Sequence, residues 1–219
     1  MICMVPLRYQ IFQLSKNWRS QTILNSLSDI PSGTKIIIDT NILVYFALAH
    51  EKFGFSCKEF IARLQKGDVS GFIPTIVLNE LAHTLMMAEL IEKGYGKNRS
   101  EAIQFMKKFS PRIKGTNHQS ASDFNDCGDN SVNNLITNTW IWMDKIPDLN
   151  CTIIPEQNST IHDSFLISRK YGLLAKDAYI AAFAKSYNVF NIATNDADFD
   201  VLPWLRTWKP KEKITYVSV

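Results

Sequence analysis

The sequence feature that most constrains the fold is a run of three isoleucines, Ile36 to Ile38, followed directly by Asp39. Consecutive branched apolar residues predict a short strand that is buried on both faces, as in a parallel sheet. In open α/β sheets, ligands bind beyond the carboxyl ends of the strands. We therefore expect Asp39 at the edge of a sheet where a ligand would bind.

Strand-like and helical segments alternate along the rest of the chain, which predicts an α/β fold with a largely parallel sheet. Apolar runs with β-branched residues predict the other strands, and helical spacing predicts the helices. The expected strands are 69–73, 151–154, 189–193 and, as a last edge strand, 214–217. The expected helices include 75–93, 100–109, 132–146 and 177–187.

The length of 219 residues suits one elaborated domain. Apolar residues at loose helical spacing predict that residues 1–33 form an N-terminal helical extension. Pro31 to Gly33 is a clean break before the first strand and ends this extension. Residues 34–219 then form the main domain. Within it, the weakly patterned stretch at about 94–150 is expected to be an elaborated region of helices and a loop.

Composition limits the class of protein and its location. The net charge of +3 permits a polyanionic partner without requiring one. The four cysteines are scattered without a C-x-x-C pair, which argues against a disulfide framework or a zinc knuckle and suits a reduced compartment. No apolar run approaches the roughly 20 residues that span a bilayer, and no signal peptide is evident. We expect a cytoplasmic protein with no membrane partner.

Four acids are placed unusually in this pattern. Asp39 and Asp196 follow strands, Glu80 borders the apolar stripe of a helix, and Asp177 lies in the first turn of the most apolar helix. Each alone is explained as a helix cap, one half of an ion pair, or a charge that complements a helix dipole. Strand ends and helix starts share one edge of a parallel sheet, however, so Asp39, Asp177 and Asp196 are expected to converge.

Carboxylates that converge within a few ångströms repel one another, and a divalent cation removes this repulsion. Ligands that are all oxygen, without His or Cys nearby, favour Mg²⁺ or Mn²⁺ over zinc. These ions typically bind through carboxylates and substrate phosphate, a combination that suits cleavage of a phosphodiester bond.

Four motifs, taken in order, resemble those of a PIN domain. They are the strand and DTN sequence of residues 36–41, Leu78 to Leu81, Lys176 to Ala182, and Ala193 to Phe199. The resemblance covers roughly residues 35 to 205. It implies a three-layer α/β/α PIN-like fold around a short, mostly parallel central sheet of four to five strands. It also implies a Mg²⁺- or Mn²⁺-dependent endoribonuclease, similar to the VapC toxins of toxin–antitoxin pairs.

The resemblance carries roles to individual positions. The expected catalytic and metal-binding acids are Asp39, Glu80, Asp177 and Asp196, with Asp198 as a less constant outer acid. Thr194 and Asn41 are expected to support these acids. The basic residues Lys176, Lys107, Lys108 and Arg112 are candidates for binding substrate phosphate. A solvated helix face is the commoner explanation for Lys107, Lys108 and Arg112, whereas an exposed lysine explains Lys176 about as well.

The expected partners are RNA, as single strands or structured loops, a small antitoxin protein, and a second copy in a homodimer. Two alternatives stay open: an RNA-processing nuclease outside a toxin pair, and a catalytically silent PIN scaffold that only binds. A phosphatase of the haloacid dehalogenase type requires a D-x-D sequence after its first strand. The sequence Asp39-Thr40-Asn41 lacks the second acid, which argues against that class.

Overall fold

The computed structural model of the chain describes residues 25–109 and 135–213. Its centre is a five-stranded sheet in the order β3-β2-β1-β4-β5, and every neighbouring pair is parallel. The strands are β1 (Lys35–Ile38), β2 (Ser70–Pro74), β3 (Thr152–Ile154), β4 (Asn191–Ala193) and β5 (Arg206–Trp208). The predicted α/β class with a short parallel sheet is confirmed.

Strand β1 occupies the middle of the sheet because it is apolar on both faces. Ile36, Ile37 and Ile38 are completely buried. Ile37 pairs with Phe72 of β2 on one side, and Ile38 pairs with Ala193 of β4 on the other. The chain builds β2 and β3 on the first side and then crosses to β4, so the strand order reverses between β1 and β4. Such a reversal is where α/β sheets form their ligand crevice.

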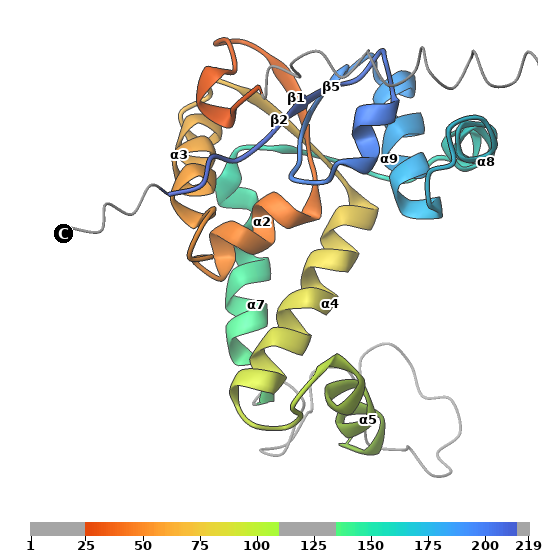
Figure 1. Cartoon of the computed structure of the whole chain (residues 1–219). Coiled ribbons are helices and arrows are strands. Elements are labelled where there is room, and N and C mark those ends of the chain that lie inside the picture. Colours follow the sequence, from red (N-terminus) through yellow and green to blue (C-terminus); the bar gives the residue numbers. More distant parts are fainter. Residues whose placement is uncertain (1–24, 110–134, 214–219) are drawn as a thin grey trace, which may run out of the picture.

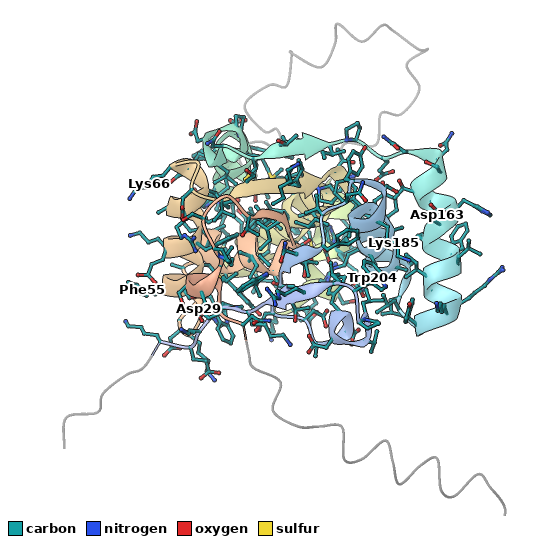
Figure 2. The ribbon with its side chains drawn as sticks, turned by 90° about the horizontal axis from the view of Figure 1, so that it is seen from above. Asp29, Phe55, Lys66, Asp163, Lys185 and Trp204 are labelled. Carbon is teal, nitrogen blue, oxygen red and sulfur yellow. The ribbon has the colours of Figure 1, made fainter. Side chains whose placement is uncertain are left out.

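Helices cover both faces of the sheet. They are α2 (Thr40–Ala47), α3 (Gly54–Gln65), α4 (Thr75–Glu92), α5 (Arg99–Phe109), α7 (Thr137–Asp144), α8 (Asn158–Tyr171) and α9 (Ala175–Ser186). Figure 1 shows α3 on one side of the strands and α8 and α9 on the other. Figure 2, seen from above, shows the same separation, with Lys66 just after α3 at one end and Asp163 of α8 at the other. The predicted three layers are therefore present.

Helix α9 lies directly against the sheet, and its alanines explain why. Residues 177–184 are all buried, and four of them are alanine. Small side chains allow the helix backbone to approach the strands closely, and a helix that is apolar nearly all round belongs in an interior. Helix α8 packs outside α9 (Figure 2). This arrangement places the first turn of α9, and with it Asp177, at the edge of the sheet.

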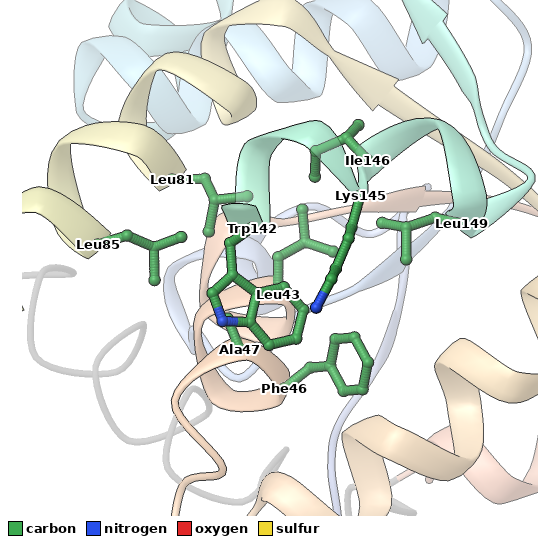
Figure 3. Close-up of a pocket in the computed structure, with 9 residues that line it drawn as sticks. All are labelled: Leu43, Phe46, Ala47, Leu81, Leu85, Trp142, Lys145, Ile146 and Leu149. Atoms are coloured by element: carbon green, nitrogen blue, oxygen red, sulfur yellow. The ribbon is translucent and has the colours of Figure 1, made fainter. Parts of the chain in front are cut away.

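Helix α4 leads from the end of β2 away from the sheet towards α5 (Figure 1). A small second core of Met87, Leu90, Ala102 and Ile136 joins α4 to α5 and to the start of α7. Between α2, α4 and α7 lies a cavity of about 20 Å³, bordered by Leu43, Phe46, Ala47, Leu81, Leu85, Trp142, Lys145, Ile146 and Leu149 (Figure 3). A volume that holds about one water molecule is a packing defect rather than a ligand site.

The structure differs from the sequence-based expectation in two elements. Residues 132–134 of the helix expected at 132–146 lie outside the described residues. The remainder is α7 (Thr137–Asp144) followed by the 3₁₀ turn η3 (Ile146–Leu149), because Pro147 favours the first turn of a new element. Strand β5 was not predicted, because Arg206 to Trp208 contains no run of branched apolar residues like those that mark the other strands. The edge strand expected at 214–217 lies outside the described residues.

Residues 25–33, the described part of the predicted extension, pack on the main domain. They contain the 3₁₀ turn η1 (Leu27–Asp29), whose Leu27 is buried in the principal core. Arg63 of α3 donates hydrogen bonds to the carbonyl oxygens of Leu27 and Ile30, at 3.2 and 2.6 Å. The division into residues 1–33 and 34–219 stays a prediction. Among the residues that the structure describes, no helix has the length and apolar character needed to cross a membrane.

Candidate metal and catalytic site

Asp39 lies directly after β1 and forms the N-cap of α2. Its side chain is only 2% exposed. One carboxylate oxygen accepts the backbone N–H of Thr40 at 2.7 Å, and the other accepts the Thr194 hydroxyl at 2.7 Å and the Asn41 amide at 2.6 Å. All three donors favour the ionised carboxylate. A buried strand end and a helix start thus fix Asp39 between them.

Thr194 connects the end of β4 to this cap. It is fully buried, and its hydroxyl donates to Asp39 while accepting the amide of Asn41 at 3.1 Å and the backbone N–H of Asp196 at 3.0 Å. The side-chain oxygen of Asn41 in turn accepts the backbone N–H of Asn195 at 3.0 Å. Thr194 and Asn41 therefore tie the loop that carries Asp196 to the first turn of α2.

Glu80 reaches the same edge from the second turn of α4. Its carboxylate accepts a hydrogen bond from the Thr40 hydroxyl and two from the Lys176 ammonium, at 2.9 and 3.2 Å. The Lys176 nitrogen also lies 3.9 Å from Asp39 Oδ1 and 3.7 Å from Asp177 Oδ1. A single ammonium group thus sits among three carboxylates that come from a strand end and two helices.

Asp177 lies in the first turn of α9, and its side chain is 7% exposed. Its Oδ1 atom is buried and has no hydrogen-bond partner among the described residues. Its carboxylate also faces Asp196 and Asp198, and one carboxylate oxygen from each of these three residues lies within 4.8 Å of the others. Buried carboxylate oxygens normally have partners, so an unpaired one calls for an explanation.

Burial and charge act in opposite directions on these acids. Burial raises the pKa of Asp177 to about 6, and Asp196, Asp39 and Asp198 add to this rise while Lys176 opposes it. Burial likewise raises the pKa of Asp39, against the attraction of Lys176. For both carboxylates the effect of burial on the pKa outweighs the attraction of the Lys176 ammonium.

Glu80 and Lys176 behave differently because they face each other. Burial alone would raise the pKa of Glu80, but the hydrogen bonds from Thr40 and Lys176 lower it overall, and the guanidinium of Arg99 contributes to the lowering. Burial alone would lower the pKa of Lys176, but Asp39, Glu80 and Asp177 raise it. Both groups are therefore held in their charged forms.

The structure brings some of the predicted residues together and not others. Lys176 lies among the acids, paired with them rather than free in solvent. Lys107 and Lys108 are exposed in the last turn of α5, beyond the far end of α4 from the sheet (Figure 1). Arg112 lies outside the described residues. The roles of all these residues stay predictions.

Sequence reasoning missed Thr40 and Arg99. Thr40 lies inside the DTN motif, and its hydroxyl could have been recognised as a donor to a neighbouring acid. Arg99 begins α5, some twenty residues after Glu80 in the sequence, and no local pattern connects the two. Only the return of the chain after α4 brings this cation within electrostatic range of Glu80.

Part of the chain is similar to a known protein family. Residues 144–205 match the family model described as the PIN domain. This range includes Asp177, Asp196 and Asp198 but not Asp39 or Glu80. The predicted resemblance to PIN domains is thereby confirmed, and it supports a PIN nuclease. No curated protein matches the chain.

Several solved structures are similar to the chain. VapBC2 from Rickettsia felis, bound to a promoter DNA fragment, is 17% identical, with 81% of this chain and 100% of that chain covered and a TM-score of 0.43. A toxin–antitoxin complex from Klebsiella pneumoniae is 16% identical, with 78% and 94% covered and a TM-score of 0.41. FitAcB from Neisseria gonorrhoeae is 14% identical, with 79% and 96% covered and a TM-score of 0.40.

Proposed function

We propose that this protein is a divalent-metal-dependent endoribonuclease whose catalytic acids are Asp39, Glu80, Asp177 and Asp196. The observation that carries the proposal is the carboxylate of Asp177. It is buried, has an oxygen without a hydrogen-bond partner, and faces two further carboxylates at the reversal point of the sheet. An arrangement of this kind is costly unless a cation completes it.

The donor set fits Mg²⁺ or Mn²⁺. Asp177, Asp196 and Asp198 would hold the ion, and they offer only carboxylate oxygens, the ligands that these hard ions prefer. Asp196 and Asp198 are more exposed than Asp177, so one side of the group is open to solvent. A substrate phosphate has room to approach there, while the buried side stays fixed by the sheet.

When bound, such an ion supplies charge neutralisation of the phosphodiester and activation of the attacking water. The chain's own residues position the acids. Thr194 and Asn41 fix Asp39 and the loop of Asp196 relative to each other. Lys176 keeps Glu80 ionised beside the site and lies 3.9 Å from the carboxylate of Asp39. Together they hold the carboxylates in place before substrate arrives, which lowers the reorganisation needed during the reaction.

The test is cleavage of a fluorescently labelled RNA oligomer with Mg²⁺ or Mn²⁺, compared with the same reaction in excess EDTA. Asp196→Asn is the informative variant because Asp196 is only partly buried and, within the described residues, its side chain accepts one hydrogen bond, from the N–H of Asp198 at 2.9 Å. The matched control is Asp163→Asn on the exposed surface of α8. We expect at least a hundredfold loss for Asp196→Asn and wild-type rates for the control, since active-site acids acting on a metal typically contribute several kcal/mol.

Two outcomes would contradict the proposal. If Asp196→Asn cleaves as fast as the wild type with Mg²⁺, the acids are not the catalytic groups. If the wild type binds Mn²⁺ but cleaves no RNA, the catalytically silent scaffold is the better account. Including a small phosphomonoester in the assay separates an RNA endonuclease from a phosphatase. Comparing cleavage of a single strand with cleavage of a hairpin loop shows which class of RNA the enzyme prefers.

We also propose a toxin role, with a small antitoxin as partner and a homodimer as the assembly. The support is the resemblance of the four motifs to those of VapC toxins. Induced expression of the wild type in bacteria should arrest growth, and Asp196→Asn should not. Light scattering of the purified variant measures the assembly, and a monomer would contradict the dimer.

A further inference from the structure

We propose that the ammonium group of Lys176 is a built-in cation that takes the place of a second divalent ion, so that the acidic site holds one metal ion per chain. This inference rests on the proposed function and adds to it the number of ions and their position. Metal-dependent nucleases use either one ion or two ions about 3.5–4 Å apart. The arrangement of Lys176 among the acids distinguishes the two cases.

The acids form two groups that share Asp177. On one side, Asp39, Glu80 and Asp177 surround the Lys176 nitrogen, at distances of 3.9, 2.9 and 3.7 Å. On the other side, Asp177 faces Asp196 and Asp198, and the described structure places no cationic group within ion-pair distance of these last two. A bridging carboxylate between two cation positions is the geometry of a two-ion site. Here the first position already carries a positive charge.

The unpaired oxygen of Asp177 shows that the lysine alone does not complete the site. At 3.7 Å the Lys176 nitrogen attracts this carboxylate but does not form a hydrogen bond with Oδ1. The Asp196 and Asp198 side therefore still requires a cation, whereas the Glu80 side is satisfied by two ammonium hydrogen bonds. A single ion placed beside Asp177, Asp196 and Asp198 satisfies the remaining need.

The position of Lys176 is not explained by its own helix. It is the second residue of α9, where the helix dipole disfavours a positive charge. The side chain is nevertheless turned into the acids and is 32% exposed. The three carboxylates thus hold the ammonium against the local preference of the helix, as they would hold a metal ion.

Counting bound Mn²⁺ tests the inference without any use of RNA. The full-length protein, freed of metal by chelation, is titrated with Mn²⁺ by calorimetry, and low-temperature electron paramagnetic resonance detects paired ions. We expect one Mn²⁺ per chain and an uncoupled signal for the wild type. Lys176→Met, which keeps most of the length of the side chain but removes its charge, should bind two Mn²⁺ ions with an exchange-coupled signal. Lys176→Arg should restore a single ion.

Lys185→Met is the matched control, because Lys185 lies in the last turn of α9, roughly 13 Å along the helix from Lys176. It should bind one ion. Circular dichroism checks that each variant folds, and Lys176→Gln serves if Lys176→Met does not. Two ions on the wild type, or one ion on both neutral variants, would overturn the inference and leave the nuclease proposal intact. No binding to the wild type at millimolar Mn²⁺ would overturn both.

Discussion

Replacing Asp177 with asparagine should make the metal-free protein more stable at neutral pH. The folded protein buries this carboxylate and raises its pKa from the ordinary value of 3.8 to about 6. A difference of about 2 units corresponds to roughly 3 kcal/mol of unfavourable free energy when the group is ionised, at 1.36 kcal/mol per unit. The attraction of Lys176 is already included in this balance.

Proton binding determines how the contribution of Asp177 to the free energy of unfolding changes with pH. Below pH 3.8 the carboxyl group is protonated in both the folded and the unfolded chain, so the penalty for burying an ionised carboxylate is absent. Between that pH and about 6 the folded chain retains a proton that the unfolded chain releases, so this group lowers the free energy of unfolding as the pH rises. Above about pH 6 the full penalty is present. Asparagine carries no charge, so the penalty is absent from the variant.

Urea unfolding followed by circular dichroism, with EDTA present, measures the effect at pH 4 and pH 7. We expect Asp177→Asn to have a higher free energy of unfolding than the wild type, and this gain should be roughly 2–3 kcal/mol larger at pH 7 than at pH 4. For Asp163→Asn we expect no such dependence on pH. Added Mn²⁺ should stabilise the wild type and not the variant. A variant that is less stable than the wild type at pH 7, or a difference that does not change with pH, would refute this account of Asp177.

Three other substitutions test the supports of the fold and site. Thr194→Val removes the hydroxyl that joins Asp39, Asn41 and Asp196. It should lower the free energy of unfolding in urea by about 1–3 kcal/mol and the cleavage rate by about 10–100-fold. An unchanged rate would contradict the positioning role of Thr194. Glu89→Ala should lower the free energy of unfolding by about 2–3 kcal/mol. Glu89 is 4% exposed and accepts hydrogen bonds from the N–H groups of Asn138 and Thr139 and from the Thr139 hydroxyl at the start of α7. The cleavage rate of the folded fraction should stay at the wild-type value. Gly71→Ala should lower the free energy of unfolding by about 1–3 kcal/mol, because a Cβ atom would lie 2.6 Å from Cys151 Sγ and 2.9 Å from Leu64 Cδ2. Equal unfolding midpoints for the variant and the wild type would show that β2 can accommodate a methyl group at this position.

The sequence predicts the sheet centre and the acidic edge because those features are encoded locally. The isoleucine run must be buried on both faces, Asp39 directly follows this strand, and Asp177 lies in the first turn of the most apolar helix. In a parallel sheet such positions share one edge, whatever the loops between them do. Asp39 and Asp177 are therefore placed by chain order alone, before any side-chain contact is known.

Other features are decided by distant parts of the chain and could not be predicted. Strand β5 is three residues long, and it forms because Arg206 to Trp208 pair with β4 rather than because of their own pattern. Lys176 looks like an ordinary surface lysine in the sequence, and only the arrival of Glu80 from α4 gives it a partner. The phosphate contact at Lys176 was predicted only because Lys176 is next to Asp177 in the sequence. In the structure its partners are the carboxylates of Asp39, Glu80 and Asp177.

The proposed nuclease activity depends on a divalent ion that binds to the carboxylates beyond the carboxyl ends of β1 and β4. Anomalous diffraction from crystals soaked in Mn²⁺ tests this most directly, because the signal locates the ion and identifies its ligands. We predict a strong anomalous peak beside the carboxylates of Asp177, Asp196 and Asp198. A map with no peak at this edge of the sheet, or with manganese bound only elsewhere on the molecule, would contradict the account.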